Sequence, residues 1–220
     1  RILPEGTGKI NQKGVDFYDR LIDGCLEAGI TPWLTLFHWD YPLELFYRGG
    51  WLNRESVEWF ADYTEVLVDR FSDRVKHWMT LNEPQCFIGL GHGSGGHAPG
   101  LKLDITDQLR VTHHALMAHG RAVQVIRAKA RTAPSIGWAP VGVTRYPVTE
   151  TAENIEAARR AMFDIPARHL WTNAWFSDPV VLGHYPEDGL RAFGKAMPSY
   201  AEADLEVMNQ PLDFYGANIY

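Results

Sequence analysis

Apolar side chains recur every three to four residues along several stretches of the chain. This spacing places them on one face of a helix, so it predicts amphipathic helices. Such helices are expected over residues 12–28, 54–72, 106–131, 151–182, 187–196 and 201–209. Proline cannot continue a helix, so Pro166 and Pro179 are expected to interrupt the 151–182 region.

Short runs rich in β-branched and aromatic residues lie between these helices and predict strands. They occupy residues 31–40, 75–84, 135–140 and 212–220, and a glycine-rich loop is expected over 89–104. Strands that alternate with helices predict a parallel sheet covered by helices. A (β/α)8 TIM barrel fits this α/β pattern better than a doubly wound sheet, because no strand is followed by a convincing phosphate-binding turn.

Polar residues stand where two of these strands end. The strand that begins near Val75 ends on Asn82 and Glu83, and Pro84 stops it. A carboxylate directly after apolar residues is costly unless it is used or paired, and barrel enzymes carry their working side chains at the carboxyl ends of strands. Glu83 is therefore a candidate catalytic carboxylate, with Asn82 beside it to orient a substrate hydroxyl. A glutamate exposed in a turn is the alternative that this stretch leaves open.

Composition narrows the classes of partner. The formal net charge of −6 gives no electrostatic reason to expect nucleic acid. No run of about 20 apolar residues is present, so no membrane partner is expected. Cys25 and Cys86 match no metal or redox spacing and favour a reducing, cytoplasmic compartment. Aromatic residues make up 12% of the chain and several lie at strand ends, where flat rings suit sugars, although most such rings are core.

Several other chemistries are not expected. Residues 91–96 match G-x-G-x-x-G formally, but Pro99 follows instead of a helix, so no nucleotide cofactor is predicted. The histidines lack the spacing and the general-base glutamate of a zinc helix, so no metal is predicted. No G-x-S-x-G elbow appears. Paired carboxylates remain, and glycoside hydrolysis needs two of them. Asp40 is read as a loop-holding residue and Asp213 as lying at the start of its strand, so the second carboxylate is expected outside this chain.

Five sequence blocks resemble glycoside hydrolase family 1, which includes β-glucosidases and β-galactosidases. The blocks follow the order and spacing of that family over the whole chain. They are Leu36-Phe-His-Trp-Asp40, Gly49-Gly-Trp-Leu-Asn53, Thr80-Leu-Asn-Glu-Pro84, Gly96-His-Ala-Pro-Gly100 and Asp213-Phe-Tyr-Gly-Ala-Asn-Ile-Tyr220. The resemblance implies a (β/α)8 barrel that hydrolyses β-glycosides with retention of configuration. By this resemblance the enzyme needs no cofactor or metal, and its partner is a small-molecule β-glycoside.

The resemblance also implies roles for individual residues. Glu83 matches the acid/base, and Asn82 matches the residue that hydrogen-bonds the sugar 2-hydroxyl. His38 matches a ligand of the 3-hydroxyl and Trp39 a wall of the sugar pocket. Tyr220 matches a tyrosine that supports the nucleophile. Asn218, nearby, is counted with the substrate-binding residues. Gln85 stands where many relatives place an aromatic residue that lines the aglycone site, which implies a roomier site.

By the same resemblance, residues 1–220 are one partial barrel domain, truncated at both ends, that carries family strands three to six. The nucleophile is then absent. Other hypotheses are a half-barrel without catalysis that binds sugar or pairs with a second copy across its open sheet edges, and a different sugar hydrolase on the same barrel. The retained pair of Asn82 and Glu83 speaks against lost catalysis, and the other matching blocks speak against a different family.

Overall fold

The computed structural model describes all residues 1–220 and contains one parallel sheet. Its strands are β1 (Trp33–Phe37), β2 (His77–Asn82), β3 (Ser135–Ala139) and β4 (Phe214–Tyr215). They lie in the order β1-β2-β3-β4, and every neighbouring pair is parallel. Each strand is therefore added beside the previous one, as in the wall of a (β/α)8 barrel.

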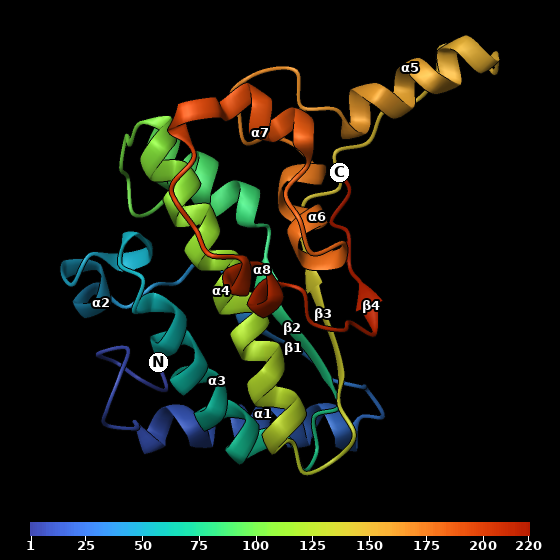
Figure 1. Cartoon of the computed structure of the whole chain (residues 1–220). Helices are drawn as coiled ribbons and strands as arrows, with labels where there is room; N and C mark the ends of the chain where they lie inside the picture. Colours follow the sequence, from blue (N-terminus) through green and yellow to red (C-terminus); the bar gives the residue numbers. More distant parts are fainter.

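Helices connect the strands and pack mainly on one side of the sheet (Figure 1). The helices are α1 (Gln12–Glu27), α2 (Leu43–Tyr47), α3 (Ser56–Phe71), α4 (Ile105–Lys129), α5 (Ala152–Phe163), α6 (Ala174–Val181), α7 (Glu187–Phe193) and α8 (Glu202–Met208). Short 3₁₀ turns cover Gly50–Leu52 and Gly194–Ala196. The predicted helices are present within a few residues of their expected ends, except that non-helical residues 164–173 divide the 151–182 region into α5 and α6. Helix α2 was not predicted.

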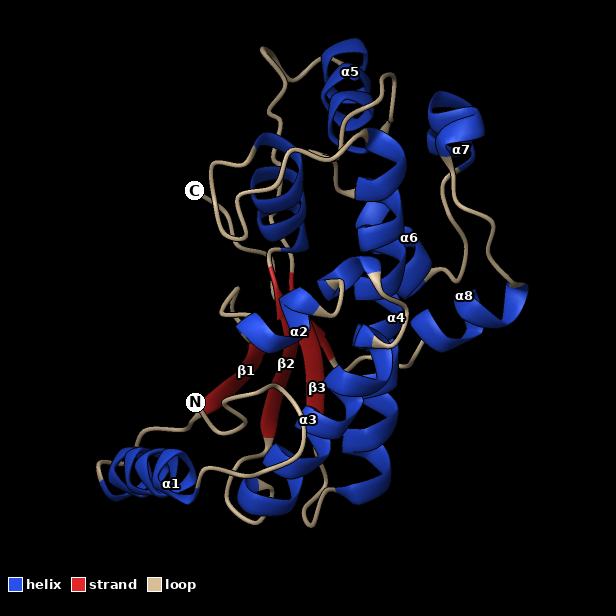
Figure 2. Cartoon of the chain, turned by 90° about the vertical axis from the view of Figure 1, so that its left-hand side faces the viewer, coloured by secondary structure: helices blue, strands red, loops and turns tan.

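The two faces of the sheet differ in how they are covered. Helices α3 and α4 pack against each other along one face, and α6 and α8 lie against α4 (Figures 1 and 2). On β2, Trp78 and Thr80 are fully buried, while the alternate residues His77 and Met79 are only half-buried. On the same open face Trp33 stacks on His77 and is 51% exposed. Successive side chains of a strand point to opposite faces of the sheet, so one face is covered by helices and the other is open.

A few elements differ from the sequence prediction. Residues Cys86–Ser94 form a π-helix, where a loop was expected from residue 89 onward. Pro179 lies inside α6 and does not interrupt it, because Trp175 and Phe176 anchor this helix in the core. The last strand covers only Phe214–Tyr215, and the chain beyond it keeps a single parallel bridge to the segment after β3.

Helix α5 stands away from the rest of the molecule (Figure 1). It is capped by Thr151, whose hydroxyl accepts a hydrogen bond from the Asn154 N–H at 3.3 Å, and none of its residues is buried. It ends at Phe163, before the predicted break at Pro166. None of the helices combines the length and the apolar character needed to cross a membrane.

Candidate active site

Glu83 lies at the carboxyl end of β2 in an unusual backbone conformation. Its φ is +44°, and Trp39, just after β1, has φ +74°; all other residues with positive φ are glycines. The left-handed region costs a residue with a Cβ roughly 1–2 kcal/mol, and such strain collects at functional sites. The Glu83 N–H donates to the Ala139 carbonyl at 2.8 Å, which ties this turn to the end of β3. Both strained residues therefore stand at the same end of the sheet.

The Glu83 carboxylate is buried and held by neutral donors. The residue is 3% exposed. Its Oε1 accepts hydrogen bonds from the Asn218 amide nitrogen at 3.0 Å and from the Tyr220 hydroxyl at 2.8 Å. Burial, with the nearby Glu83 carboxylate, raises the pKa of the Cys86 thiol to about 12. A hydrogen bond to Glu83 also raises the pKa of Tyr220. Cys86 and Tyr220 thus keep their protons near neutral pH, and the Tyr220 hydroxyl donates to the carboxylate.

Asn82 is fixed by its neighbours. Its side-chain oxygen accepts a hydrogen bond from Asn218 at 2.8 Å, so its NH2 group points the other way, toward His38 Nε2 at 3.4 Å. The Trp39 indole N–H donates to the Asn82 carbonyl at 2.9 Å. These hydrogen bonds join the end of β1 to the end of β2 and to the segment after β4. Asn218 uses its amide nitrogen for Asn82 and Glu83, which makes it a support for both.

His38 and Trp39 form one wall beside this cluster. His38 is exposed and Trp39 is half-buried, with its ring 5.4 Å from that of His97 between centroids. His97 comes from the glycine-rich segment that follows the π-helix. The sequence prediction that these two residues lie near Asn82 and Glu83 agrees with the hydrogen bonds from Trp39 and to His38.

The Gln85 side chain does not lie on the surface beside His38 and Trp39, and its prediction as an aglycone residue is corrected. It is completely buried. Its NH2 group donates to the carbonyls of Val141 at 3.4 Å and Thr172 at 3.3 Å, and its oxygen accepts from the Val141 N–H at 3.2 Å. Its amide is therefore occupied by backbone groups. The turn at Glu83 directs it into the protein, which residue spacing alone did not show.

The other two acidic candidates have structural partners. Asp40 forms an ion pair with Arg1 at 2.6 Å. Asp213 accepts hydrogen bonds from the Ile136 N–H at 2.7 Å and from Arg127 at 2.6 Å, beside the start of β3. Asp213 therefore lies at the end of the sheet opposite Glu83, as its place in the sequence indicated. The Glu83 cluster holds no second carboxylate.

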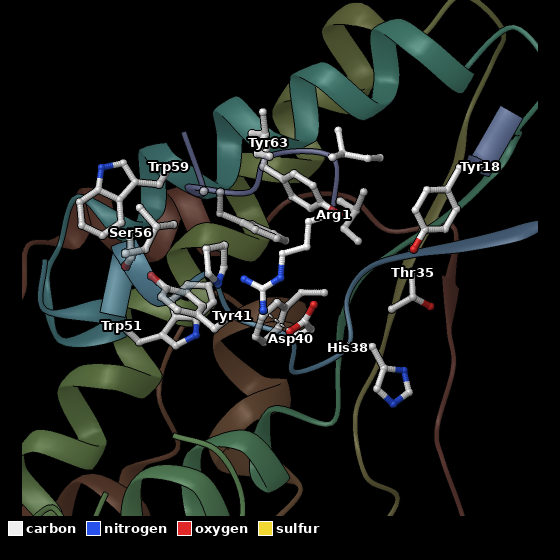
Figure 3. Close-up of a pocket in the computed structure, with 18 residues that line it drawn as sticks. Arg1, Tyr18, Thr35, His38, Asp40, Tyr41, Trp51, Ser56, Trp59 and Tyr63 are labelled. Carbon is white, nitrogen blue, oxygen red and sulfur yellow. Dashed lines mark hydrogen bonds and ion pairs between the residues drawn. The ribbon is translucent and has the colours of Figure 1, made fainter. Parts of the chain in front are cut away.

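Two cavities flank the turn that follows β1. One of about 230 Å³ lies between the N-terminal segment, β1 and α3, and Figure 3 shows Arg1 reaching across it to Asp40. His38 stands at its edge, but Asn82 and Glu83 do not line it. The second, of about 360 Å³, is lined by Trp39, His92 and Pro99 among others. These hollows adjoin the His38–Trp39 wall, and neither contains the carboxylate.

The buried histidines have structural partners, and no cluster of His, Cys, Asp and Glu could hold a metal ion. His92 Nδ1 donates to the Phe87 carbonyl at 2.8 Å, and His114 Nδ1 to the Trp51 carbonyl at 2.8 Å. Burial lowers the pKa of both rings, in the case of His114 to about 4. Their imidazoles are neutral near pH 7 and serve to satisfy backbone carbonyls.

The whole chain is similar to one family of known proteins. The sequence profile of Glycosyl hydrolase family 1 matches residues 1–220. The chain belongs to glycosyl hydrolase family 1. It is 44% identical over 221 residues to the 1,4-beta-D-glucan glucohydrolase of Thermotoga neapolitana and 45% identical over 222 residues to Beta-glucosidase A of Acetivibrio thermocellus. These alignments cover 100% of this chain but 50% and 48% of those proteins.

Solved structures of the family agree in fold. The β-glucosidase from Thermotoga maritima in complex with glucoimidazole is similar with a TM-score of 0.87 and 42% identity, over 100% of this chain and 48% of that one. The family enzymes are TIM barrels, so the predicted fold class is confirmed: the four parallel strands correspond to part of such a barrel. The chain spans about half the length of the curated relatives it matches.

Proposed function

We propose that this chain carries the acid/base side of the active site of a retaining β-glycosidase, and that Glu83 is the acid/base. The observation that carries the proposal is the buried Glu83 carboxylate at the carboxyl end of β2, in a strained turn and surrounded by neutral donors. Membership of glycosyl hydrolase family 1 supports it. The chain is then a single domain that forms about half of the barrel.

In this mechanism Glu83 first gives its proton to the glycosidic oxygen while a second carboxylate attacks the anomeric carbon. A covalent glycosyl-enzyme forms, the aglycone leaves, and Glu83 as a carboxylate then takes a proton from the water that releases the sugar. In retaining enzymes the two carboxyl groups stand about 5–5.5 Å apart. The second must come from residues that close the open face of the sheet. Tyr220, whose hydroxyl lies 2.8 Å from Glu83 Oε1, is proposed to support this second carboxylate.

The surrounding residues are proposed to hold the sugar. The Asn82 NH2 group, turned away from Asn218, donates to the 2-hydroxyl, and such a contact strengthens in the transition state. His38 binds the 3-hydroxyl and the Trp39 ring forms a wall of the pocket. We propose a terminal β-linked glucose as the sugar, because the relatives named above are β-glucosidases or a glucan glucohydrolase.

A chimera tests this function. The chain replaces the matching 221-residue segment of Beta-glucosidase A of Thermotoga maritima, to which it is 43% identical. The chimera should hydrolyse aryl β-glucosides, and Glu83→Gln should slow substrates with poor leaving groups by about 10²–10⁴-fold, because those depend most on protonation. For substrates with good leaving groups, the rate of glycosyl-enzyme formation should fall less. Rates are measured over a series of aryl glucosides.

Asp40→Asn is the matched control, since Asp40 is exposed and paired with Arg1. It should leave the leaving-group dependence unchanged. An equal loss with good and poor leaving groups in Glu83→Gln would show that Glu83 is not the acid. Exogenous azide should restore the second step of the Glu83→Gln chimera and yield a β-glycosyl azide, because azide needs no general base.

A non-catalytic half-barrel is the second candidate, favoured by the open face of the sheet. Trp33 on the edge strand β1 is 51% exposed on this face, and its ring lies 5.0 Å from that of Phe214 on the other edge strand, β4. Under this proposal two copies would close their sheets against each other. Sedimentation of the 220-residue chain would then give twice its mass of 24.9 kDa. The chain would also bind sugar, and the chimera would not hydrolyse glycosides.

A further inference from the structure

The chain continues beyond β3 as a segment, residues 140–143, whose two edges have different partners. On one edge the segment pairs with the backbone after β4. The Gly142 N–H donates to the Asn218 carbonyl at 2.8 Å, and the Asn218 N–H donates to the Pro140 carbonyl at 2.9 Å. These two bonds form the parallel bridge between Val141 and Asn218. The backbone position of Asn218 is thus set by this segment.

The other edge of the segment has no strand beside it, because β2 ends at Asn82 and the chain then turns into the π-helix. The side-chain amide of Gln85 instead bonds both the N–H and the carbonyl of Val141, at 3.2 and 3.4 Å. The side-chain amide of Asn173 bonds both the N–H and the carbonyl of Val143, at 2.9 and 2.8 Å. A primary amide carries the donor and the acceptor of a peptide group, so these two side chains take the place of a neighbouring strand.

Both amides are buried and bond further backbone groups. Gln85 is 0% exposed and Asn173 is 9% exposed. The Gln85 NH2 group also donates to the Thr172 carbonyl at 3.3 Å, and that of Asn173 to the Met162 carbonyl at 3.0 Å. Asn173 precedes α6, yet its side chain makes no capping bond to this helix, the usual role of asparagine at that position. Opening of the segment would leave both buried amides without partners, which makes it costly.

We propose that Gln85 and Asn173 are positioning residues for the reaction proposed above, and that they act through Asn218. This inference rests on the proposed function of Glu83. The segment held by the two amides fixes the Asn218 backbone, and the Asn218 side chain donates to the Asn82 oxygen at 2.8 Å and to Glu83 Oε1 at 3.0 Å. Gln85 follows Glu83 by two residues, so the turn that presents the carboxylate also fixes the position of its donor.

Hydrogen exchange of the 220-residue chain tests these contacts without any activity. Gln85→Met keeps the length of the side chain and removes its amide. The N–H groups of Gly142 and Asn218 should then exchange about tenfold faster, while those of β2 stay protected. Gln210→Met is the matched control, because the Gln210 amide bonds only the Glu206 carbonyl, at 2.8 Å, just after α8. Unchanged exchange at Gly142 and Asn218 in Gln85→Met overturns the proposal.

Two further variants separate these contacts from a general loss of folding. If Gln85→Met also loses protection in β2, Gln85→Glu replaces it, since it has equal size and keeps an oxygen for the Val141 N–H. It loses the donors to the carbonyls of Val141 and Thr172, so faster exchange of the Gly142 N–H is expected again. Asn173→Leu removes the second amide and should act in the same direction.

The chimera tests the consequence for catalysis. Gln85→Met and Asn218→Ala should each lower kcat/KM for an aryl β-glucoside by about tenfold, because the donor of Glu83 is misplaced or lost. The double variant should lose no more than Asn218→Ala alone, since Gln85 acts through Asn218. Losses that multiply would show that Gln85 supports only the fold. If the parent chimera is inactive, the proposed function fails, and hydrogen exchange still decides whether the two amides hold Asn218.

Discussion

At the scale of single residues, Asp204 joins parts of the chain that are far apart in sequence. Its carboxylate accepts from Arg54 at 2.5 and 3.1 Å, from His113 Nε2 at 3.1 Å and from the Ala201 N–H at 3.3 Å. His113 Nδ1 in turn accepts from the Tyr185 hydroxyl at 3.0 Å. The hydrogen bond from Arg54, with the others, holds the pKa of Asp204 well below its usual range. These hydrogen-bond donors compensate the burial of the Asp204 carboxylate.

Asp204→Ala should therefore destabilise the chain by about 3 kcal/mol, since it leaves the buried His113 N–H without a partner. Asp107→Ala is the matched control on the surface, where Asp107 pairs with Arg110 at 2.8 Å and both side chains are partly exposed. That change should cost less than about 0.5 kcal/mol. Urea unfolding measures both, and equal losses would contradict the importance given to the buried network.

At the scale of elements, α8 is docked on α4 through a glycine. A Cβ at Gly120 would stand 1.7 Å from the Val207 carbonyl oxygen, so the backbones of the two helices approach as closely as hydrogen allows. Helix α8 carries Asp204, and the close contact brings this residue to His113 on α4. The small residue in the long helix is therefore required by packing, although glycine lowers helix propensity.

Gly120→Ala should push α8 away from α4 and destabilise the chain by about 2–3 kcal/mol, in spite of the higher helix propensity of alanine. Gly24→Ala on α1 is the control, because no atom lies within 4 Å of a Cβ built there. That variant should gain about 0.5–1 kcal/mol. The shift of the urea midpoint measures both, and a gain at Gly120 would disprove the close packing.

At the scale of the whole molecule, buried neutral histidines make folding sensitive to acid. Burial lowers the pKa of His92, His113, His114 and His119, for His114 to about 4 and for His119 to about 3. The unfolded chain binds these protons near pH 6.5, while the folded chain does not. Below that pH the unfolded state holds more protons, so the free energy of unfolding falls as the pH falls.

The free energy of unfolding should thus be nearly constant above about pH 7 and should fall by several kcal/mol between pH 6.5 and pH 4. Each histidine that is charged only in the unfolded chain contributes roughly 1.4 kcal/mol per pH unit to this slope. His119→Gln, which can keep the contact with Thr80 and does not titrate, should flatten the slope by one such contribution. Denaturant unfolding at a series of pH values measures it, and an unchanged slope would refute this account.

Much of the architecture follows from local patterns. The stripes of α1, α3 and α4 and the alternation of helices with apolar runs were sufficient to predict helices near their observed bounds and a parallel sheet. The loop prediction was wrong for residues 89–94, because a π-helix has no sequence period of its own. The predicted break at Pro179 was also wrong, because core contacts of α6 outweigh the cost of proline.

The candidate site, like the fold, was predicted only in part from the sequence. The sequence by itself placed Asn82, Glu83, His38 and Trp39 at strand ends, since parallel strands bring their carboxyl ends to one edge, and the family followed from sequence blocks in register. Only the tertiary structure turned Gln85 inward and brought Asn218 onto Asn82 and Glu83. Those contacts depend on one strained turn at Glu83 and on strands that are distant in sequence. Local spacing does not encode them, because the direction of a side chain after a turn is decided by the backbone that packs around it.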